Sequence, residues 1–324
     1  MVASATSIAS GLLRSAANAA ATQMPPPPCT LSHCATGPQF LVLSSQRAGT
    51  HFLAEQLNSF GLLYHHDELL WNRSTATYDT WCEAVSQYLD EACRKASKTQ
   101  RSGGVMMLTD FVAPTFGRYQ PRFDVHRALE SIAKANIRII LYERRNALAQ
   151  VVSAVFHQGG QSPLVSTRYP SYTAKLRRER LNVSAEALLS KVRARVETND
   201  KVRALLSTAA SSSNLQWTML FYEDLLASTE EDVRQDHSAT LRQIHGFLGV
   251  PHKELVMAVE RHAGAAQSAK SNATSSASSS GKLVKLHTGC VTQYLHASKA
   301  ALAKAFHHSP YEWMLGDGCA LTDE

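Results

Sequence analysis

The sequence contains no stretch that approaches the ~18–20 consecutive apolar residues a helix needs to cross a membrane. This absence argues against a standard single-span membrane anchor. Close C-x-x-C pairs are also missing, because the six cysteines are scattered and no Cys/His cluster accompanies them. We therefore expect no zinc site. In a chain of 324 residues, six scattered cysteines are compatible with reduced thiols or with a few disulfides.

Acidic residues are absent from the beginning of the chain, where Glu55 is the first. Residues 1–24 are rich in Ala, Ser and Thr and carry Arg14, a composition that resembles an organelle transit peptide and also fits a disordered tail. We expect residues 1–36 to be a disordered or targeting segment ahead of one domain at residues 37–318. A plastid, a mitochondrion or the cytoplasm is the favoured location, and the secretory pathway is the alternative.

Charged residues are moderately frequent, and basic residues outnumber acidic ones. Charged residues make up 19% of the chain, hydrophobic residues make up 44%, and the formal net charge is +6. These proportions are ordinary for a globular protein. A basic balance suits an anionic partner such as a nucleotide, a sulfated glycan, nucleic acid or a membrane surface, and does not choose among them.

Short apolar runs alternate with segments whose apolar residues recur at helical spacing. Strands are predicted at residues 40–45, 105–108, 137–142 and 215–222, and helices at 52–60, 123–135, 147–156, 183–206 and 241–248. This alternation indicates an α/β protein in which a central parallel sheet lies between two layers of helices. Two Ser/Ala-rich stretches, at residues 207–214 and 264–281, predict loops, and the second is expected to be a flexible surface loop.

One turn has the features of a phosphate-binding site. Residues 44–53, SSQRAGTHFL, lie between a predicted buried strand and a predicted helix. A helix that starts at the carboxyl end of a parallel strand offers unpaired N–H groups and the positive end of its dipole. Gly49 lets the backbone approach a phosphate closely, Thr50 adds a hydroxyl donor, and Arg47 adds a fixed forked charge.

The same turn is not a Walker A motif. With Gly49 in the place of the second glycine, Ser44 stands where the first glycine belongs and Thr50 stands where the lysine belongs. Hydrolysis of ATP or GTP is therefore not favoured. Taken alone, an R-x-G-T turn is a weak signal that an ordinary strand–helix turn also produces.

Two further segments of interest follow predicted strands. Arg145 precedes a helix that carries Ser153 eight residues later, and an Arg fork and a hydroxyl can hold one phosphate from two sides. The segment FYEDLLAS contains Tyr222, which can lie beside an adenine ring. Taken alone, each is more often a solvated arginine, a helix-surface serine or a half-buried strand tyrosine.

Together and in this order, the three segments resemble the PAPS-dependent sulfotransferases, whose donor is 3′-phosphoadenosine-5′-phosphosulfate (PAPS). Arg145 and Ser153 keep the family's spacing, and the wording of LYERRNALAQVVSA and PYEWML looks nearest to its carbohydrate and nodulation-type bacterial branch. The resemblance implies a P-loop nucleoside-triphosphate-hydrolase-like fold. It also implies transfer of a sulfuryl group from PAPS to a hydroxyl acceptor, a carbohydrate or glycolipid by branch, without a metal ion.

The family's binding roles carry over to the matching positions. The turn at residues 47–52 would hold the 5′-phosphosulfate through backbone amides, and Arg47 would also stabilise charge on the oxygen that bridges phosphorus and sulfur. Arg145 and Ser153 would bind the 3′-phosphate, and Tyr222 would contact the adenine. The residues expected in the turn are Arg47, Ala48, Gly49, Thr50, His51 and Phe52.

The resemblance also implies a general base. Glu68, in YHHDELLWN, stands near the place where related members carry it, and the neighbouring His65, His66 and Asp67 are alternative candidates. The sequence departs from the family where Leu108 and Thr109 occupy the place of a frequent lysine. Near the C-terminus, the basic closing segment of the cytosolic branch is matched only weakly, by Gly281, Lys282 and Lys285.

Two other functions stay open. A small-molecule kinase needs a phosphate loop with lysine, which is missing, and a Mg²⁺-binding aspartate, for which Asp110 is a candidate. A binder of sulfated glycans or nucleic acid, or an inactive homologue, is the second alternative. Lys and Arg are spread through the chain with a single tight cluster at residues 177–180, so a nucleic-acid partner is not expected.

Overall fold

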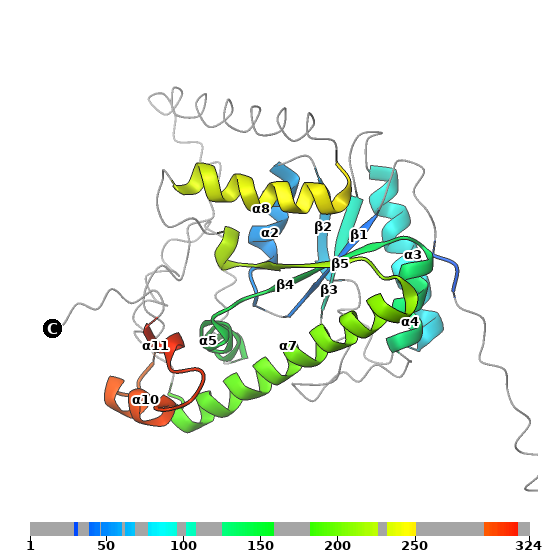
Figure 1. Ribbon diagram of the computed structural model, residues 1–324. Helices are drawn as coiled ribbons and strands as arrows, with labels where there is room; N and C mark the ends of the chain where they lie inside the picture. Colours follow the sequence, from blue (N-terminus) through cyan, green and yellow to red (C-terminus); the bar gives the residue numbers. More distant parts are fainter. Residues whose placement is uncertain are drawn as a thin grey trace, which may run out of the picture.

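Five parallel strands form one sheet in the described part of the chain, in the order β2-β3-β1-β4-β5 (Figure 1). The computed structural model describes residues 29–31, 39–45, 47–59, 62–68, 77–95, 102–107, 125–158, 182–225, 232–250 and 295–316. The strands are β1 (Phe40–Ser44), β2 (Leu63–Glu68), β3 (Ser102–Met107), β4 (Arg138–Glu143) and β5 (Trp217–Phe221). Every pairing between them is parallel, which confirms the predicted sheet.

Helices connect the strands and close the domain. The helices of the first half are α2 (Thr50–Ser59), α3 (Tyr78–Lys95), α4 (Val125–Lys134) and α5 (Ala147–Gln158). The long α7 (Ala185–Ser213) leads into β5, which is followed by the 3-10 turn η2 (Glu223–Leu225) and α8 (Asp232–Leu248). Two short helices, α10 (Lys299–Phe306) and α11 (Trp313–Gly316), end the described chain.

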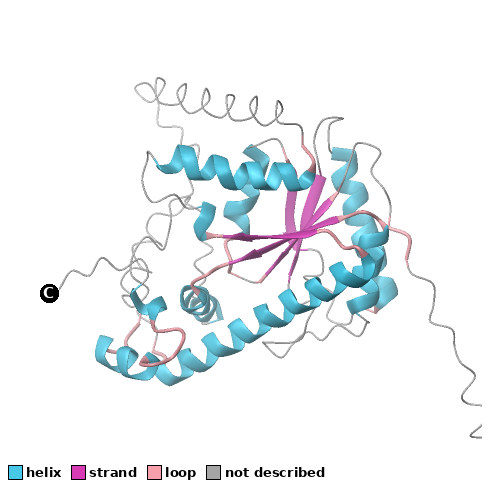
Figure 2. Cartoon of the chain, viewed as in Figure 1, coloured by secondary structure: helices cyan, strands magenta, loops and turns pink. Residues whose placement is uncertain are grey.

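Helices cover both faces of the sheet, because successive side chains of a strand point to opposite faces. In β1, Phe40 and Val42 pack with α2 and α8, whereas Leu41 and Leu43 pack with α3, α4 and α7. All four side chains are buried. Figure 2 shows the strands with helices on either side. The expected three-layer α/β/α architecture is therefore confirmed.

The prediction of a loop at residues 207–214 is wrong, because α7 continues to Ser213. Alanine is the best helix former, and Ala209 also packs into the core beneath α3 and α4. The helix ends at Asn214, which has the left-handed conformation common at C-caps, with φ 57° and ψ 31°. A Ser/Ala composition was therefore a poor guide to disorder here. The Ser-rich stretch at 264–281 lies outside the described residues.

Residues 63–68 form the edge strand β2, although their polar side chains gave no strand signal. The strand pairs with β3 through a register shift between His65 and Glu68. Helix α3 was not predicted either, and α8 begins at Asp232 instead of residue 241. The Asp110, Lys282 and Lys285 positions lie outside the described residues.

The helices α10 and α11 pack against the domain beside α5. A hydrophobic cluster joins α5, α7, α10 and α11 and includes the buried Leu302 and Phe306. The Nδ2 atom of Asn146 also donates a hydrogen bond to the carbonyl oxygen of Met314, at 3.2 Å. The closing PYEWML segment therefore lies near the start of α5 (Figure 1).

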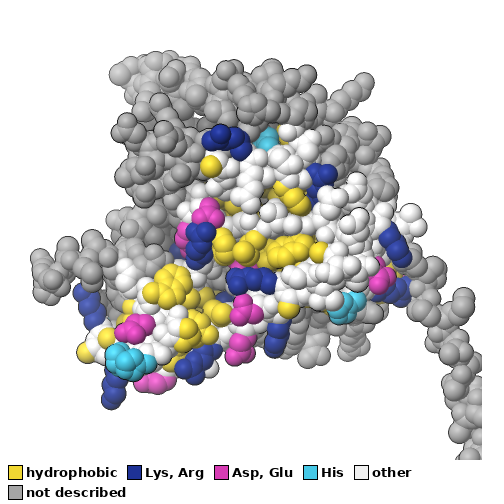
Figure 3. Space-filling view, in the orientation of Figure 1, with side chains coloured by type: hydrophobic (Ala, Val, Ile, Leu, Met, Phe, Trp, Pro, Cys, Tyr) yellow, Lys and Arg dark blue, Asp and Glu magenta, His cyan; other side chains and the backbone are white. Residues whose placement is uncertain are grey.

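Hydrophobic side chains gather on one visible face along the edge strand β5 and over α10 and α11 (Figure 3). Trp217 and Met219 of β5 are partly buried, and Trp313 of α11 is 52% exposed. Among the described helices, none has the length and apolar character needed to cross a membrane.

A disulfide between Cys29 and Cys82 ties the segment before β1 to α3. The N–H of Cys29 donates a hydrogen bond to the hydroxyl of Tyr78 at 3.0 Å, and Leu31 is buried. Cys93 is disulfide-bonded as well. Residues 29–31, which precede the expected domain start at 37, are thus packed on the domain, and the cysteines described are oxidised.

We expect Cys29→Ser to lower the free energy of urea unfolding by about 2–4 kcal/mol, because the disulfide closes a loop that restricts the unfolded chain. The double variant Cys29→Ser/Cys82→Ser should be destabilised to a similar extent, since either change breaks the same bond. Equal stability of the wild type and the double variant would show that this crosslink is absent from the folded protein.

His245 of α8 is a buried histidine that has no hydrogen-bond partner among the described residues. Its side chain is 2% exposed, and neither ring nitrogen bonds to another described residue. Burial lowers the pKa of His245 to about 4 from its usual 6.5. The folded protein therefore holds a neutral imidazole through the range in which the unfolded chain takes up a proton.

His245 therefore does not lower the free energy of unfolding above pH 6.5. Its burial lowers that free energy progressively as the pH drops from 6.5 toward 4. The expected loss is about 1.4 kcal/mol per pH unit, or about 3 kcal/mol in all. We expect His245→Leu to flatten this part of the pH profile of unfolding free energy. The control His296→Gln, which changes an exposed histidine, should leave the slope as it is. An unchanged slope in His245→Leu would contradict the assignment.

Candidate active site

The carboxyl ends of β1, β4 and β5 meet at one edge of the sheet. The register places Ser44 beside Tyr142 and Tyr142 beside Leu220. From this edge the chain leaves β1 toward α2 on one face, and leaves β4 toward α5, which packs against α7. Diverging connections of neighbouring strands mark the switch point at which open α/β sheets bind ligands.

The turn between β1 and α2 has an unusual backbone. Arg47 has a φ of 66° and Gly49 a φ of 95°. Ala48, between them, is buried, and its N–H donates to the carbonyl oxygen of Ser45 at 3.3 Å. A left-handed conformation at a non-glycine residue costs on the order of 1–3 kcal/mol and is concentrated at functional sites. Left-handed residues of this kind direct neighbouring N–H groups into anion-binding concavities.

Helix α2 starts at this turn with its positive end toward the sheet edge. The first hydrogen bond of the helix runs from the N–H of Leu53 to the carbonyl oxygen of Gly49, at 3.1 Å. The N–H groups of Thr50, His51 and Phe52 precede that bond, so the helix supplies no acceptor for them. This is the strand–turn–helix unit that the sequence predicted around residues 44–53.

The turn packs directly on Tyr222. A Cβ atom on Gly49 would lie 2.6 Å from Cδ2 and 2.7 Å from Cε2 of the Tyr222 ring. Phe52 meets the same ring edge-on, with ring centroids 5.8 Å apart and planes at 70°. The structure thus brings together two sequence-predicted parts of the site, the turn and Tyr222. The contact of Tyr222 with an adenine stays a prediction.

Arg144 is a neighbour of Tyr222 that the sequence did not reveal. Its guanidinium carbon lies 4.9 Å from the centre of the Tyr222 ring. Burial raises the pKa of the Tyr222 hydroxyl, and the nearby Arg144 opposes this shift. Tyr222 is therefore a neutral phenol. Its ring lies between the turn and the end of β4, with the Arg144 guanidinium over it.

Arg145, predicted to bind a phosphate, makes a forked ion pair in this structure. Its Nη1 and Nη2 atoms lie 2.5 and 3.1 Å from the two carboxylate oxygens of Asp224. Its guanidinium carbon is 4.2 Å from the centre of the Phe221 ring. The side chain is 46% exposed. The fork uses two of the five guanidinium N–H groups, and the other three make no hydrogen bond to another described residue.

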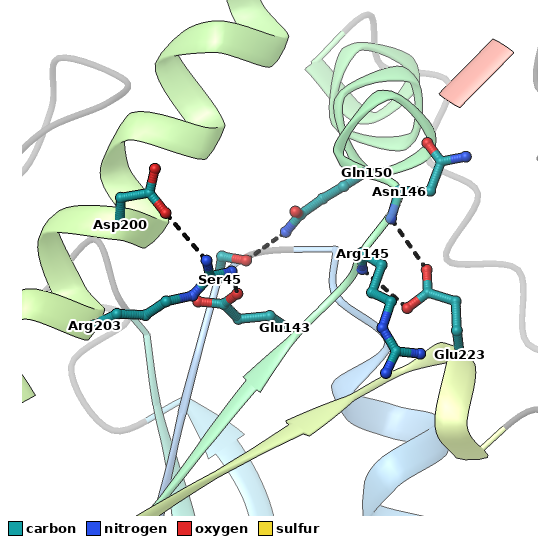
Figure 4. A network of polar contacts seen from close by, with 8 residues as sticks. All are labelled: Ser45, Glu143, Arg145, Asn146, Gln150, Asp200, Arg203 and Glu223. Atoms are coloured by element: carbon teal, nitrogen blue, oxygen red, sulfur yellow. Dashed lines mark hydrogen bonds and ion pairs between the residues drawn. The ribbon is translucent and has the colours of Figure 1, made fainter. Parts of the chain in front are cut away.

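Glu223 holds the start of α5, as Figure 4 shows. Its carboxylate accepts hydrogen bonds from the N–H groups of Arg145 and Asn146, at 2.9 and 3.3 Å. The side chain of Asn146 accepts a third bond from the N–H of Ala149, at 2.9 Å. The sequence gave Glu223 and Asp224 no role, although both directly follow Tyr222 in the segment FYEDLLAS.

Ser153, the second predicted phosphate ligand, lies within α5 and is 7% exposed. In the described part of the chain, no hydrogen bond joins it to Arg145, whose guanidinium is directed to Asp224. The structure therefore places Arg145 at the start of α5 and Ser153 about two turns into the helix, without direct contact between them.

A buried polar network lies on the α7 side of β4 (Figure 4). Glu143 forms an ion pair with Arg203 of α7, and Gln150 of α5 donates a hydrogen bond to the hydroxyl of Ser45. Burial raises the pKa of the Glu143 carboxyl, and Arg203 counteracts the shift. The ion pair ties the end of β4 to α7, and the hydrogen bond ties the residue after β1 to α5.

Glu68, the predicted general base, is the last residue of the edge strand β2. It aligns with Val105 of β3, which aligns with Val42 of β1. Its backbone therefore lies two strands, or about 10 Å, from β1. Within the described ranges, no three His, Cys, Asp or Glu side chains are grouped to hold a metal ion.

No family model matches the sequence, and no curated protein matches it. Among solved structures, it is similar to mouse sulfotransferase SULT7A1 complexed with PAP, with 11% identity, coverage of 89% of each chain and a TM-score of 0.33. The α/β/α architecture of the chain is that of the five-stranded parallel sheet and the helices on its two faces.

We expect Gly49→Ala to lower the free energy of unfolding by about 1–3 kcal/mol, because the methyl group meets the Tyr222 ring and φ is positive. Gly246→Ala in α8 is the matched control, since no atom lies within 4 Å of its Cβ position. That change should instead stabilise the helix by about 0.5–1 kcal/mol. Urea unfolding measures both. A Gly49→Ala variant as stable as the wild type would contradict the described turn.

Proposed function

We propose that this protein is a sulfotransferase that moves a sulfuryl group from PAPS to a hydroxyl group of an acceptor. The observation that carries the proposal is the meeting of three sequence segments at one edge of the sheet. They are the turn at residues 47–52, the Arg145 segment after β4 and the Tyr222 segment after β5. Their order along the chain, and the spacing of Arg145 and Ser153, resemble those of the PAPS-dependent sulfotransferases.

The turn and the start of α2 suit the 5′ end of such a donor. The N–H groups of Thr50, His51 and Phe52 stand at the positive end of the helix dipole, and Gly49 keeps side-chain atoms out of the turn. Arg47 is half-buried in the same turn and adds a full positive charge. These features match the two negative groups of a phosphosulfate.

Arg145 suits the 3′-phosphate that distinguishes PAPS from ordinary nucleotides. Asp224 holds its guanidinium in place, and three N–H groups of Arg145 are directed elsewhere. Ser153 is proposed as the second ligand of this phosphate, and Tyr222 as the residue beside the adenine. Tyr222 stands between the two phosphate sites because it contacts the turn at Gly49 and belongs to the same segment as Asp224.

The proposed reaction is an in-line displacement that needs positioning and charge stabilisation more than covalent help. The acceptor oxygen forms a bond to sulfur while the bond from sulfur to the bridging oxygen breaks. Arg47 stabilises the negative charge that appears on that bridging oxygen. Glu68 takes the proton of the acceptor hydroxyl. A carbohydrate or glycolipid acceptor is proposed from the resemblance to the carbohydrate branch, and no metal ion is needed for these roles.

The direct test is thermal unfolding with adenosine 3′,5′-bisphosphate (3′,5′-ADP), ordinary ADP, and ATP with Mg²⁺, at equal concentrations. A ligand that binds only the folded state adds about 2.7 kcal/mol at a hundredfold excess over its Kd. We expect a clear rise of the Tm with 3′,5′-ADP and a smaller one with ADP. A larger rise with ATP and Mg²⁺ would favour a kinase, and no rise with any nucleotide would exclude a nucleotide-dependent enzyme.

The 3′-phosphate site is tested in the same experiment with Arg145→Ala. Loss of a charge-assisted fork should weaken 3′,5′-ADP by about 10- to 100-fold while leaving 5′-AMP unchanged. The control is Arg193→Ala, which removes an exposed arginine of α7 and should alter neither ligand. Equal weakening of 3′,5′-ADP and 5′-AMP in Arg145→Ala would show that Arg145 does not read the 3′-phosphate.

A further inference from the structure

Tyr142 is a second tyrosine at the sheet edge, and no sequence motif pointed to it. It is the residue of β4 that lies beside Ser44, the last residue of β1. Its side chain is 0% exposed and belongs to the hydrophobic cluster on the α2 and α8 side. An aromatic ring in that position is ordinary core packing. A hydroxyl group buried there is unusual, because it needs a hydrogen-bond partner.

The hydroxyl of Tyr142 has no hydrogen-bond partner among the described residues. Buried polar groups are nearly always paired, and one left unpaired is costly, so each exception needs a reason. Burial raises the pKa of Tyr142 well above its usual value, with Tyr222 and Glu223 adding to the shift and Arg144 opposing it. Tyr142 is therefore a neutral O–H donor that lacks an acceptor.

This hydroxyl is directed at the turn that starts α2. The Tyr142 oxygen lies 3.5 Å from the position that a Cβ atom of Gly49 would occupy. The edge of the Tyr222 ring borders the same position, at 2.6 Å. Because residue 49 is a glycine, it places no side chain of its own between the Tyr142 hydroxyl and the backbone of the turn. The unpaired donor thus lies beside the turn from which α2 begins.

We propose that the Tyr142 hydroxyl is a ligand-binding group, which donates a hydrogen bond to an oxygen of the phosphosulfate held by the turn at residues 47–52. This inference rests on the proposed function, since it names a further binding residue of the same site. The oxygen atoms of a phosphate or sulfate ester supply the acceptor that the described residues do not provide. Without an anion in the turn, the folded protein bears the cost of the unpaired hydroxyl.

The proposal separates Tyr142 from a tyrosine with a structural hydroxyl. Tyr78 is also buried, and its hydroxyl bonds to Ser131 Oγ at 2.7 Å and to the N–H of Cys29 at 3.0 Å. Replacement of each tyrosine by phenylalanine removes one oxygen atom and leaves the ring. Tyr78→Phe is therefore the matched control for Tyr142→Phe.

Without ligand, we expect Tyr142→Phe to unfold at the same or a higher urea concentration than the wild type, because the change removes an unpaired polar group. Tyr78→Phe should unfold at a lower concentration, because it leaves the partners of its hydroxyl unpaired. A fall in the urea midpoint of Tyr142→Phe comparable to that of Tyr78→Phe would overturn the proposal, since it would assign the hydroxyl a structural partner.

With ligand, we expect Tyr142→Phe to weaken 5′-AMP and 3′,5′-ADP equally, by about 10-fold, because both carry the 5′-phosphate. Isothermal titration measures both affinities. Tyr78→Phe should bind both nucleotides as the wild type does. Unchanged affinities in Tyr142→Phe, or a loss confined to 3′,5′-ADP, would overturn the assignment of Tyr142 to the turn.

Inorganic pyrophosphate separates this proposal from the proposed function. If the wild type binds pyrophosphate but not 3′,5′-ADP, sulfotransferase activity is excluded, and weaker pyrophosphate binding in Tyr142→Phe still supports an anion ligand for Tyr142. If the wild type binds none of the three probes, both proposals fail together.

Discussion

The approach of the Gly49 backbone to the ring of Tyr222 is the contact on which this edge of the molecule depends. The ring fills the space that a side chain at residue 49 would need. Its position is set in turn by the sheet, because the N–H of Tyr222 donates to the carbonyl oxygen of Glu143 at 2.8 Å. The orientation of the first N–H groups of α2 is thus coupled to the register of β1, β4 and β5. Donors held in a fixed direction by the fold are the basis of electrostatic preorganisation.

Three arginines near this edge already have carboxylate partners within the protein. Arg144 lies 3.8 Å from Glu223, Arg145 is forked on Asp224, and Arg203 pairs with Glu143. The formal net charge of +6 did not reveal this local balance. A carboxylate beside each of these three guanidinium groups limits the repulsion between them and fixes the direction of their donors. It also weakens their attraction for an anion. Selectivity at such a site comes from geometry more than from total charge.

The buried strands were predictable because they are continuous apolar runs, and β1, β4 and β5 lie where residues 40–45, 137–142 and 215–222 indicated. The glycine-containing turn and the spacing of Arg145 and Ser153 were readable for a similar local reason. Strand β2 was missed because HHDE has no apolar pattern, and the helical end of α7 because Ala209 is buried by distant α3 and α4. The ion pair of Asp224 and the position of Tyr142 beside Gly49 depend on contacts between separate strand ends, which no local pattern encodes.

The hydrogen bond from Asn146 to Met314 has a consequence for the time course of synthesis. It joins residues 168 positions apart, and it restrains the residue that follows Arg145 and caps α5. A ribosome completes the central strand and the Arg145 segment long before it reaches α11. The start of α5 therefore gains this restraint only after synthesis has reached Met314. A nascent chain that is interrupted before Met314 would contain all five described strands and still lack this restraint beside Arg145.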